Sequence, residues 1–484
     1  MDQTVKNQTI NSAKWNFLER IAVQGIQFIL GVVMARMLVP SDYGAVGMLA
    51  VFFAVSQSFI DSGFSSALIR KKNQSDRDFS TVFYFNIVIS LVAYGILFAI
   101  APWVGSFFNL PILCSVLRVQ AVVLVINAFM AVQVAMLQIK LDFRSLALRN
   151  VLATLVSGFC GVAFAYLGYG IWSLVYQQII AAAFNLIFIC CVCRWFPKTG
   201  FSWRSFRELG SFGFKLLVSG LLHTLYLNMT SFAIGKFYSP KDLGFYTRGS
   251  QFAQLPNKTI NGVLHSIMYP IMAKIQDDEA RLINVYRKYI RITSLSIFIF
   301  SGLLVALAKP IILLCLTDKW FNAIIFLQAF AFSSMFDHLS TINLTLLKVK
   351  GRSDLYLKLE VIKKLISVTI LFLAIPNGVL AICLSAVVYN FIAVYINSYY
   401  TGKFFKLTCF QQFKDYLPYL LCCIFACTPA YLLTLLNIPY LIMISVGSMV
   451  ALGLYWFLLR NNADMIEIIG LAKDKFRRKR YNNV

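Results

Sequence analysis

The sequence is short of charge, and above all of acidic charge. Only 13% of its 484 residues are Asp, Glu, Lys or Arg, while 59% are hydrophobic. So few charges cannot cover the surface of a soluble domain of this length, which indicates that lipid solvates most of it. Basic residues outnumber acidic ones by 44 to 20. In a soluble protein that excess would point to nucleic acid. Here the basic residues gather in short loops, as topology signals do, and we expect no nucleic-acid partner.

Motifs of common enzymes and metal sites are also missing. The sequence has no G-x-x-x-x-G-K-[ST] phosphate loop and no HExxH pair, so hydrolysis of ATP by a P-loop is excluded. Most of the eleven cysteines lie inside apolar runs, and no CxxC has a second CxxC at zinc spacing. We therefore predict neither a metal site nor a cofactor, and no catalytic residues.

The chain does contain many apolar runs of membrane-spanning length. A helix needs about 20 residues to cross the hydrocarbon core. That length predicts an all-α polytopic protein with about 14 transmembrane helices, of which the first and the segment 244–273 are the least hydropathic. The expected spans lie near residues 14–37, 45–68, 80–104, 114–138, 146–167, 170–194, 209–237, 244–273, 291–315, 321–347, 355–375, 378–401, 416–436 and 439–459. The polar N-terminus shows no cleavable signal peptide, so the first span should be retained.

Basic residues alternate between the expected loops. Every second loop, together with both tails, holds about 32 of the 44 Lys and Arg residues, whereas the alternate loops hold only about four. Since Lys and Arg concentrate in cytoplasmic loops, both termini are predicted to be cytoplasmic. The basic segment 473–481 is expected to contact anionic lipid.

The sequence also repeats itself. Residues 35–44 (ARMLVPSDYG) align with 235–244 (GKFYSPKDLG), and residues 140–146 echo 350–357. An even number of spans per repeat gives two lobes of six helices in parallel repeat, an arrangement typical of alternating-access transporters with a cavity between the lobes. The expected division is an N-terminal lobe 1–195, a C-terminal lobe 196–405, a helix pair 406–460 and a basic cytoplasmic tail 461–484.

Polar side chains fall on one face of several expected spans. Ionisable groups at membrane depth are costly and face a cavity by default. We predict that basic and polar groups of these faces bind an anionic head group such as a diphosphate: Arg20, Gln24, Lys215, Arg248, Gln251, Lys258, Asn261 and His265. Three carboxylates are candidates for ion coupling: Glu19, Asp61 and Asp337.

Each of these assignments has an alternative. Arg20 and Lys215 could instead extend to the cytoplasmic interface, and Glu19 could form only a local pair with Arg20. Asp337 and His338 could be a structural pair. Lys363 and its neighbour Lys364 are expected to reach the cytoplasmic surface.

Several motifs in order carry a family resemblance: WNFLERIAVQGIQFI (15–29), ARMLVPSDYGAVGML (35–49), FIDSGFSSALIRKK (59–72), STVFYFN (80–86), IGKFYSPKDLGFYTR (234–248), RKYIRIT (287–293) and KGRSDLYLKLEVIKK (350–364). Over residues 10–405 the chain resembles the multidrug/oligosaccharidyl-lipid/polysaccharide exporter superfamily, in its polysaccharide flippase branch of the colanic acid exporter type.

The resemblance implies two six-helix bundles arranged as a V plus two extra helices, in a bacterial inner membrane. It implies ion-driven transport, with Na⁺ or H⁺ as the cation, of an undecaprenyl-diphosphate-linked oligosaccharide to the outer leaflet. The implied partners are that lipid-linked substrate, membrane lipids and a polysaccharide assembly machinery.

Three other readings stay open. The chain could be a cation-coupled multidrug exporter, although a basic cavity should repel cationic drugs. It could move the cell-wall precursor instead. It could also be a membrane glycosyltransferase or polymerase, which would need carboxylates on the outer face, where Asp42, Asp242 and Asp318 lie.

Overall fold

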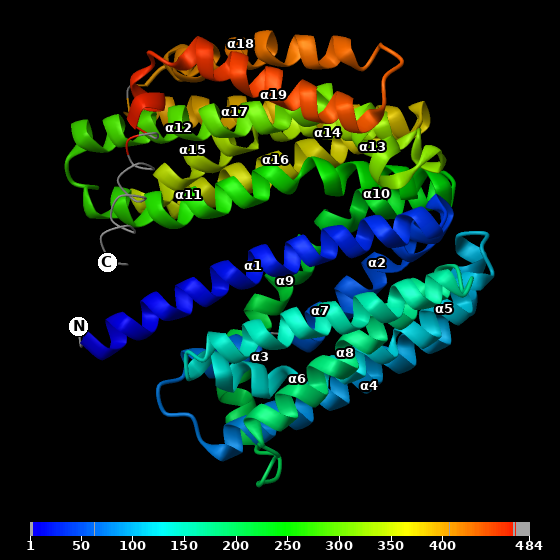
Figure 1. The fold of residues 1–484 in the computed structure, drawn as a ribbon. Coiled ribbons are helices and arrows are strands. Elements are labelled where there is room, and N and C mark those ends of the chain that lie inside the picture. Colours follow the sequence, from blue (N-terminus) through cyan, green and yellow to red (C-terminus); the bar gives the residue numbers. More distant parts are fainter. Residues whose placement is uncertain (1–2, 62, 406, 468–469, 471–484) are drawn as a thin grey trace, which may run out of the picture. The chain divides into compact units, whose positions relative to one another are not determined.

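A computed structural model describes residues 3–61, 63–405, 407–467 and 470, and within them it is helical throughout its regular elements (Figure 1). The basic segment 473–481 lies outside these residues. Packing divides the chain into two compact units, Met1–Gly244 and Phe245–Val484. The predicted lobe boundary after residue 195 rests on the sequence repeat and stays a prediction. By packing, residues 203–237 belong with the N-terminal helices.

Unit 1 contains helices α1 to α9 and the first residues of α10. They are α1 (Gln3–Met37), α2 (Pro40–Asp61), α3 (Phe64–Arg70), α4 (Asp76–Phe107), α5 (Ile112–Gln120), α6 (Val122–Ile139), α7 (Phe143–Tyr166), α8 (Ile171–Cys193), α9 (Trp203–Phe237) and α10 (Pro240–Ala253). Helix α9 packs along α2, and α7 packs between α1 and α8.

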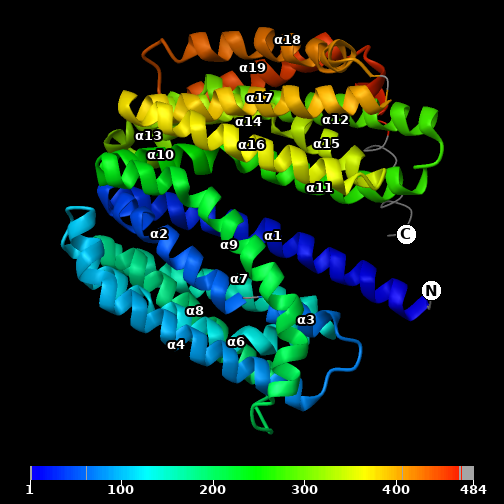
Figure 2. The same ribbon diagram turned by 180° about the vertical axis from the view of Figure 1, so that it is seen from behind.

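Unit 2 continues with shorter and more often interrupted helices. They are α11 (Leu255–Lys274), α12 (Glu279–Ala306), α13 (Ala308–Leu316), α14 (Ala323–Ser334), α15 (Asp337–Val349), α16 (Ser353–Ala374), α17 (Val379–Phe405), α18 (Cys409–Leu433) and α19 (Tyr440–Leu459), with short 3₁₀ turns at Asp318–Trp320 and Ile375–Asn377. Helices α16 and α17 run side by side (Figure 2).

The helix pair α18 and α19 is held on α12 by both apolar packing and charge. Gly302 of α12 faces the thiols of Cys423 and Cys427, where a larger residue would collide. Arg287 Nε and Nη2 donate to both carboxylate oxygens of Asp415 on α18, at 2.8 and 2.7 Å. Asp415 is buried, so this bidentate pair is one of the charge-assisted contacts that count most in a protein interior.

The predicted repeat is visible in the local structure. One helix ends at Met37 and the next begins at Pro40, and the same happens 200 residues later at Phe237 and Pro240. Proline suits the first turn of a helix because it has no N–H to leave unsatisfied. The two junctions also touch within unit 1. A Cβ added at Gly44 would collide with the Pro240 carbonyl oxygen, and one added at Gly244 would collide with that of Pro40.

Among the described residues, twelve helical segments are long and apolar enough to cross a membrane by length and composition, so the chain is a multi-pass membrane protein. The total of fourteen stays a prediction. The two expected spans outside the twelve are 244–273, which forms α10 and α11, and 355–375, which forms most of α16. Both contribute polar side chains to the cavity described next.

Candidate functional site

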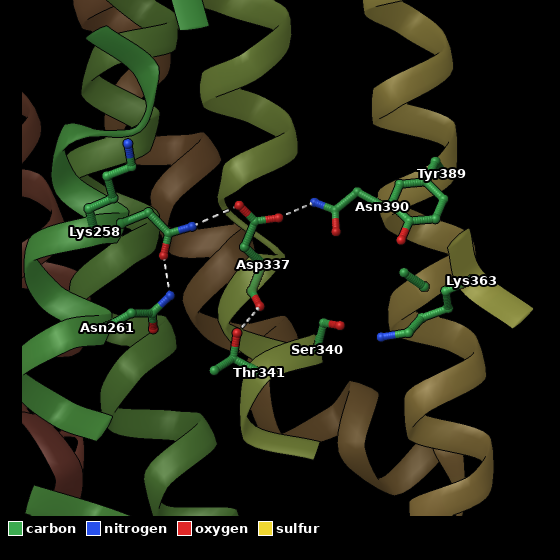
Figure 3. A pocket seen from close by; sticks show the side chains of 10 residues that line it. Lys258, Asn261, Asp337, Ser340, Thr341, Lys363, Tyr389 and Asn390 are labelled. Atoms are coloured by element: carbon green, nitrogen blue, oxygen red, sulfur yellow. Dashed lines mark hydrogen bonds between the residues drawn. The ribbon is translucent and has the colours of Figure 1, made fainter. Parts of the chain in front are cut away.

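A polar cavity of about 430 Å³ lies inside unit 2 (Figure 3). Helices α11, α15, α16 and α17 line it with Asn257, Lys258, Asn261, Asp337, Ser340, Thr341, Lys363, Tyr389, Asn390 and Ala393. Three of the predicted site residues, Lys258, Asn261 and Asp337, therefore meet in one place. A second cavity of about 570 Å³, bordered by α12, α14, α17 and α18, is lined mainly by apolar and aromatic side chains.

The cavity is built around a broken helix. Helix α14 ends at Ser334 and α15 begins at Asp337, and the last carbonyl groups of an α-helix have no partner within it. Two asparagines donate to carbonyl groups at this break. Asn390 Nδ2 donates to Ser333 O at 2.6 Å, and Asn257 Nδ2 donates to Ser334 O at 2.9 Å. In a membrane, such a break is tolerated only where protein groups or water satisfy the backbone.

The same two asparagines hold the carboxylate of Asp337. Asn257 Nδ2 donates to Oδ2 at 2.9 Å and Asn390 Nδ2 donates to Oδ1 at 2.7 Å. Asp337 also stands in the first turn of α15, where the helix dipole favours negative charge. His338 is not its partner, because the ring Nε2 lies 2.7 Å from Ser294 Oγ on the other side of the helix. Amide groups orient the carboxylate but supply no opposite charge.

Two lysines line the cavity in different ways. Lys258 is exposed, and its ammonium is turned away from Asp337 (Figure 3). Lys363 was expected to reach the cytoplasmic surface, but it is buried instead. Its ammonium points into the cavity towards Ser340 (Figure 3) and lies 2.5 Å from Glu360 Oε1. The cavity therefore combines a carboxylate, two ammonium groups and several amide and hydroxyl groups, a set suited to both cations and oxygen-rich polar ligands.

The remaining predicted residues of unit 2 lie outside this cavity. Arg248 on α10 is half-buried, and its Nη1 donates to Gln251 Oε1 at 3.0 Å. Gln251 is exposed. His265 on α11 stacks on Tyr269 with ring centroids 5.8 Å apart. Their predicted role in substrate binding stays a prediction.

In unit 1, the predicted residues of α1 separate from one another. Arg20 is exposed, whereas Glu19 and Gln24 are half-buried. Glu19 accepts a hydrogen bond from Asn150 Nδ2 on α7, and Arg149, which is buried, donates to the side-chain oxygen of that same asparagine at 2.8 and 3.1 Å. An amide thus links the acid to a cation that sequence reasoning had passed over. Lys215 lies on α9, and its side chain is outside the described part of the chain.

Asp61 ends α2 with an exposed side chain and closes a short row of hydrogen bonds. Asn127 Nδ2 donates to Gln57 Oε1 at 3.1 Å, and Gln57 Nε2 donates to Asp61 Oδ1 at 3.0 Å. The row joins α2 to α6 at the point where α2 ends. Within the described residues no group of His, Cys, Asp and Glu side chains is arranged to hold a metal ion.

Comparison with known proteins finds a matching family and several similar proteins. The family model described as "Polysaccharide biosynthesis protein" matches residues 33–325. The succinoglycan biosynthesis transport protein ExoT of Rhizobium meliloti is 24% identical over 66% of this chain and 65% of its own length, so the match spans just under two thirds of that relative. The teichuronic acid biosynthesis protein TuaB of Bacillus subtilis is 24% identical over 73% of each chain. The lipopolysaccharide biosynthesis protein WzxC of Escherichia coli is 22% identical over 74% of each chain.

Solved structures support the same fold. The lipid II flippase MurJ, in an inward closed conformation, matches with a TM-score of 0.74 at 14% identity, over 93% of this chain and 99% of its own. An inward-facing multidrug resistance MATE family transporter of the MOP superfamily matches with a TM-score of 0.62 at 15% identity, over 81% and 98% of the two chains. At these identities the likeness concerns the fold.

Proposed function

Because the chain belongs to the polysaccharide biosynthesis protein family, we propose that it is a flippase that moves a lipid-linked oligosaccharide across a bacterial inner membrane. The substrate class is an undecaprenyl-diphosphate-linked repeat unit, carried from the cytoplasmic to the outer leaflet for assembly into an extracellular polysaccharide or O-antigen. Both termini face the cytoplasm, where the basic loops gather.

The polar cavity of unit 2 is the observation that carries this proposal. A transporter needs buried polar groups, because its cargo must leave water within a protein solvated by lipid. Lys258 and Asn261 border the cavity and would bind the diphosphate or the sugar next to it. Arg20, Gln24, Lys215, Arg248, Gln251 and His265 are the further candidates for contacts with the substrate.

The proposed driving force is a gradient of Na⁺ or H⁺ acting on a carboxylate. Asp337 is the strongest candidate, because it lines the cavity together with Lys258 and has no opposite charge beside it in the described structure. Glu19 and Asp61 are the candidates in unit 1. The lipid-linked substrate and membrane lipids are the proposed partners, together with the machinery that polymerises the exported units.

Catalysis is the less favoured reading. Two of the three outer-face carboxylates that a transferase would need are used to begin helices. Asp242 Oδ2 accepts from Ser239 N and Oγ at 3.3 and 2.6 Å, and Asp42 Oδ2 accepts from Val39 N at 3.3 Å. Carboxylates in such positions stabilise the first turn of a helix.

Mass spectrometry of lipid extracts from cells with and without the gene tests the proposal. Deletion should cause a diphosphate-linked oligosaccharide to accumulate, and its mass would identify the sugar. Unchanged lipid intermediates combined with new sensitivity to cationic drugs would favour the multidrug exporter. Accumulation of the cell-wall precursor would make that lipid the substrate.

Two charge removals test the binding residues in the same assay. Lys258→Ala and Arg248→Ala should each cause the intermediate to accumulate while the protein still inserts into the membrane. Lys198→Ala is the matched control, because Lys198 is exposed in the loop between α8 and α9. Normal export by both test variants would rule out the diphosphate-binding role.

A further inference from the structure

Lys363 is a buried lysine with two carboxylates near it, Glu360 and Asp337. Its side chain is 6% exposed, and it pairs with Glu360 one turn earlier on α16, whose side chain is 29% exposed. Across the cavity lies Asp337, and within the described residues the two form no ion pair (Figure 3). The buried ammonium of Lys363 therefore pairs with Glu360 and lies across the cavity from Asp337, with which it does not pair.

The two carboxylates differ in how well they tolerate being left alone. Glu360 reaches the edge of the packed helices, where solvent can stabilise its charge. Asp337 is half-buried among α11, α15 and α17, and its two amide partners carry no charge. A half-buried carboxylate that has only uncharged partners in a protein solvated by lipid readily binds a proton, a metal cation or an ammonium group. Glu360 can release Lys363 at little cost, whereas Asp337 gains much by receiving it.

We propose that Lys363 is a tethered competitor of the coupling cation at Asp337. When a monovalent cation or a proton occupies Asp337, the Lys363 ammonium stays on Glu360, as in this structure. When that cation leaves, the ammonium moves to Asp337 and Glu360 is left to solvent. The proposal rests on the proposed function, since it assumes that a cation drives transport.

Few other charged groups are placed to compete with a cation at Asp337. The ionisable groups that line the cavity beside Asp337 are Lys258 from α11, Lys363 from α16 and Tyr389 from α17. The Lys258 ammonium is turned away (Figure 3), and Tyr389 bears no positive charge. From α12, which also packs against α15, Ser294 meets His338 on the side away from the cavity. Lys363 is thus the cation placed to reach Asp337.

Removing each partner of the Lys363–Glu360 pair should shift cation binding in opposite directions. The full-length protein in lipid nanodiscs is titrated with NaCl against choline chloride at constant ionic strength, and its thermal unfolding is followed, because a bound ion stabilises the folded state. A parallel titration with acid tests the proton as the cation. Lys363→Gln should tighten the apparent binding roughly five- to hundredfold, the usual range of coupling between two sites. Glu360→Gln should weaken it, since the ammonium then stays on Asp337.

Asp337→Asn is the reference variant and should remove the response to either cation. If the ion pair is purely structural, Lys363→Gln and Glu360→Gln should shift the midpoint of the cation titration in the same direction. That outcome would overturn the proposal. So would binding that neither variant alters. If Lys363→Gln does not fold, the direction in which Glu360→Gln changes cation affinity still decides the proposal. These assays need no lipid-linked substrate, so they can fail while the flippase function stands, and the reverse also holds.

Discussion

The two units contain related rows of polar side chains, with the carboxylate at opposite ends. Each row consists of three side chains joined by two hydrogen bonds: Asn127, Gln57 and Asp61 in unit 1, and Asp337, Asn257 and Asn261 in unit 2. The positions correspond through the sequence repeat, at an offset of 200 residues for α2 and α11 and of 210 for α6 and α15. The repeat has thus kept the polar contact between these helices and exchanged the acid for an amide.

The exchange changes the surroundings of the charge. Asp61 ends α2 with its side chain exposed, so its ionised form keeps part of its solvation. Asp337 begins α15 inside a cavity and receives a further amide, Asn390. The match of residues 168–174 with 377–383, at an offset of 209, places Ala181 at the corresponding position of unit 1, where no polar group stands. A carboxylate in the second setting responds much more strongly to a passing cation. The comparison supports the proposal that the coupling cation binds at Asp337 in unit 2 and not at Asp61 in unit 1.

The strongest test of this difference between the units is to neutralise Asp337 and Asp61 in turn. Asp337→Asn should abolish polysaccharide export, because the cavity then has no acid to bind the cation. Asp61→Asn should reduce export about tenfold or less, since it weakens one exposed charge-assisted hydrogen bond. Both are measured as accumulation of the lipid-linked intermediate at equal protein level in the membrane. A larger defect in the Asp61 variant would reverse the assignment.

The ion pairs of the two units should also differ in their contribution to stability. Arg287→Met leaves the buried Asp415 without its bidentate partner and should lower the free energy of unfolding by about 2–3 kcal/mol. Lys71→Met, the matched change in unit 1, breaks contacts with the exposed Glu208 and the buried Asp78. It should have a smaller effect, because Asp78 keeps the hydrogen bonds from Ser75 N and Oγ. Thermal unfolding in detergent compares them, and equal losses would contradict the difference.

Asn390→Ala tests the amide that only unit 2 possesses. It removes one donor from Asp337 and leaves Ser333 O without its side-chain partner, a loss of about 1–2 kcal/mol. Asn127→Ala in unit 1 should cost less, because Gln57 still holds Asp61. The same unfolding assay measures both variants. A neutral Asn390→Ala would mean that water readily replaces this amide.

The smallest effect is expected at the edge of unit 1. Burial lowers the pKa of Lys71, but its hydrogen bonds to Glu208 and Asp78 outweigh that and raise the pKa above the usual 10.5. Stability from such a group is fully present below 10.5 and is lost as the pH rises through the raised pKa. Glu208→Gln should therefore cost less than about 1 kcal/mol at neutral pH, and the difference from the wild type should vanish in strongly alkaline solution. A difference that grows with pH would exclude the ion pair as its cause.

Much of the fold could be predicted because lipid imposes simple rules on sequence. Runs of apolar residues indicated the helices, and the repeat located the junctions before Pro40 and Pro240. The segment 244–273 was less clear. It divides at Gln254 into α10 and α11, with Pro256 in the first turn of the new helix.

The site was predicted only in part. Lys258, Asn261 and Asp337 were selected because polar groups are rare in spans, and the structure brings them to one cavity. Asn390, one of two asparagines in the otherwise largely apolar helix α17, carried the same signal and was overlooked. The position of Lys363 could not be predicted, because its distance along α16 suits the membrane surface and only the packing of α15 and α17 turns it inward.

The reciprocal contact between the junctions has a further consequence. Gly44 meets the carbonyl of Pro240, and Gly244 meets that of Pro40, so each repeat offers the same patch and receives the same patch. That is the form of an isologous interface, which two identical subunits make around a twofold axis. The covalent chain thus preserves, at these four positions, the geometry of a symmetric dimer.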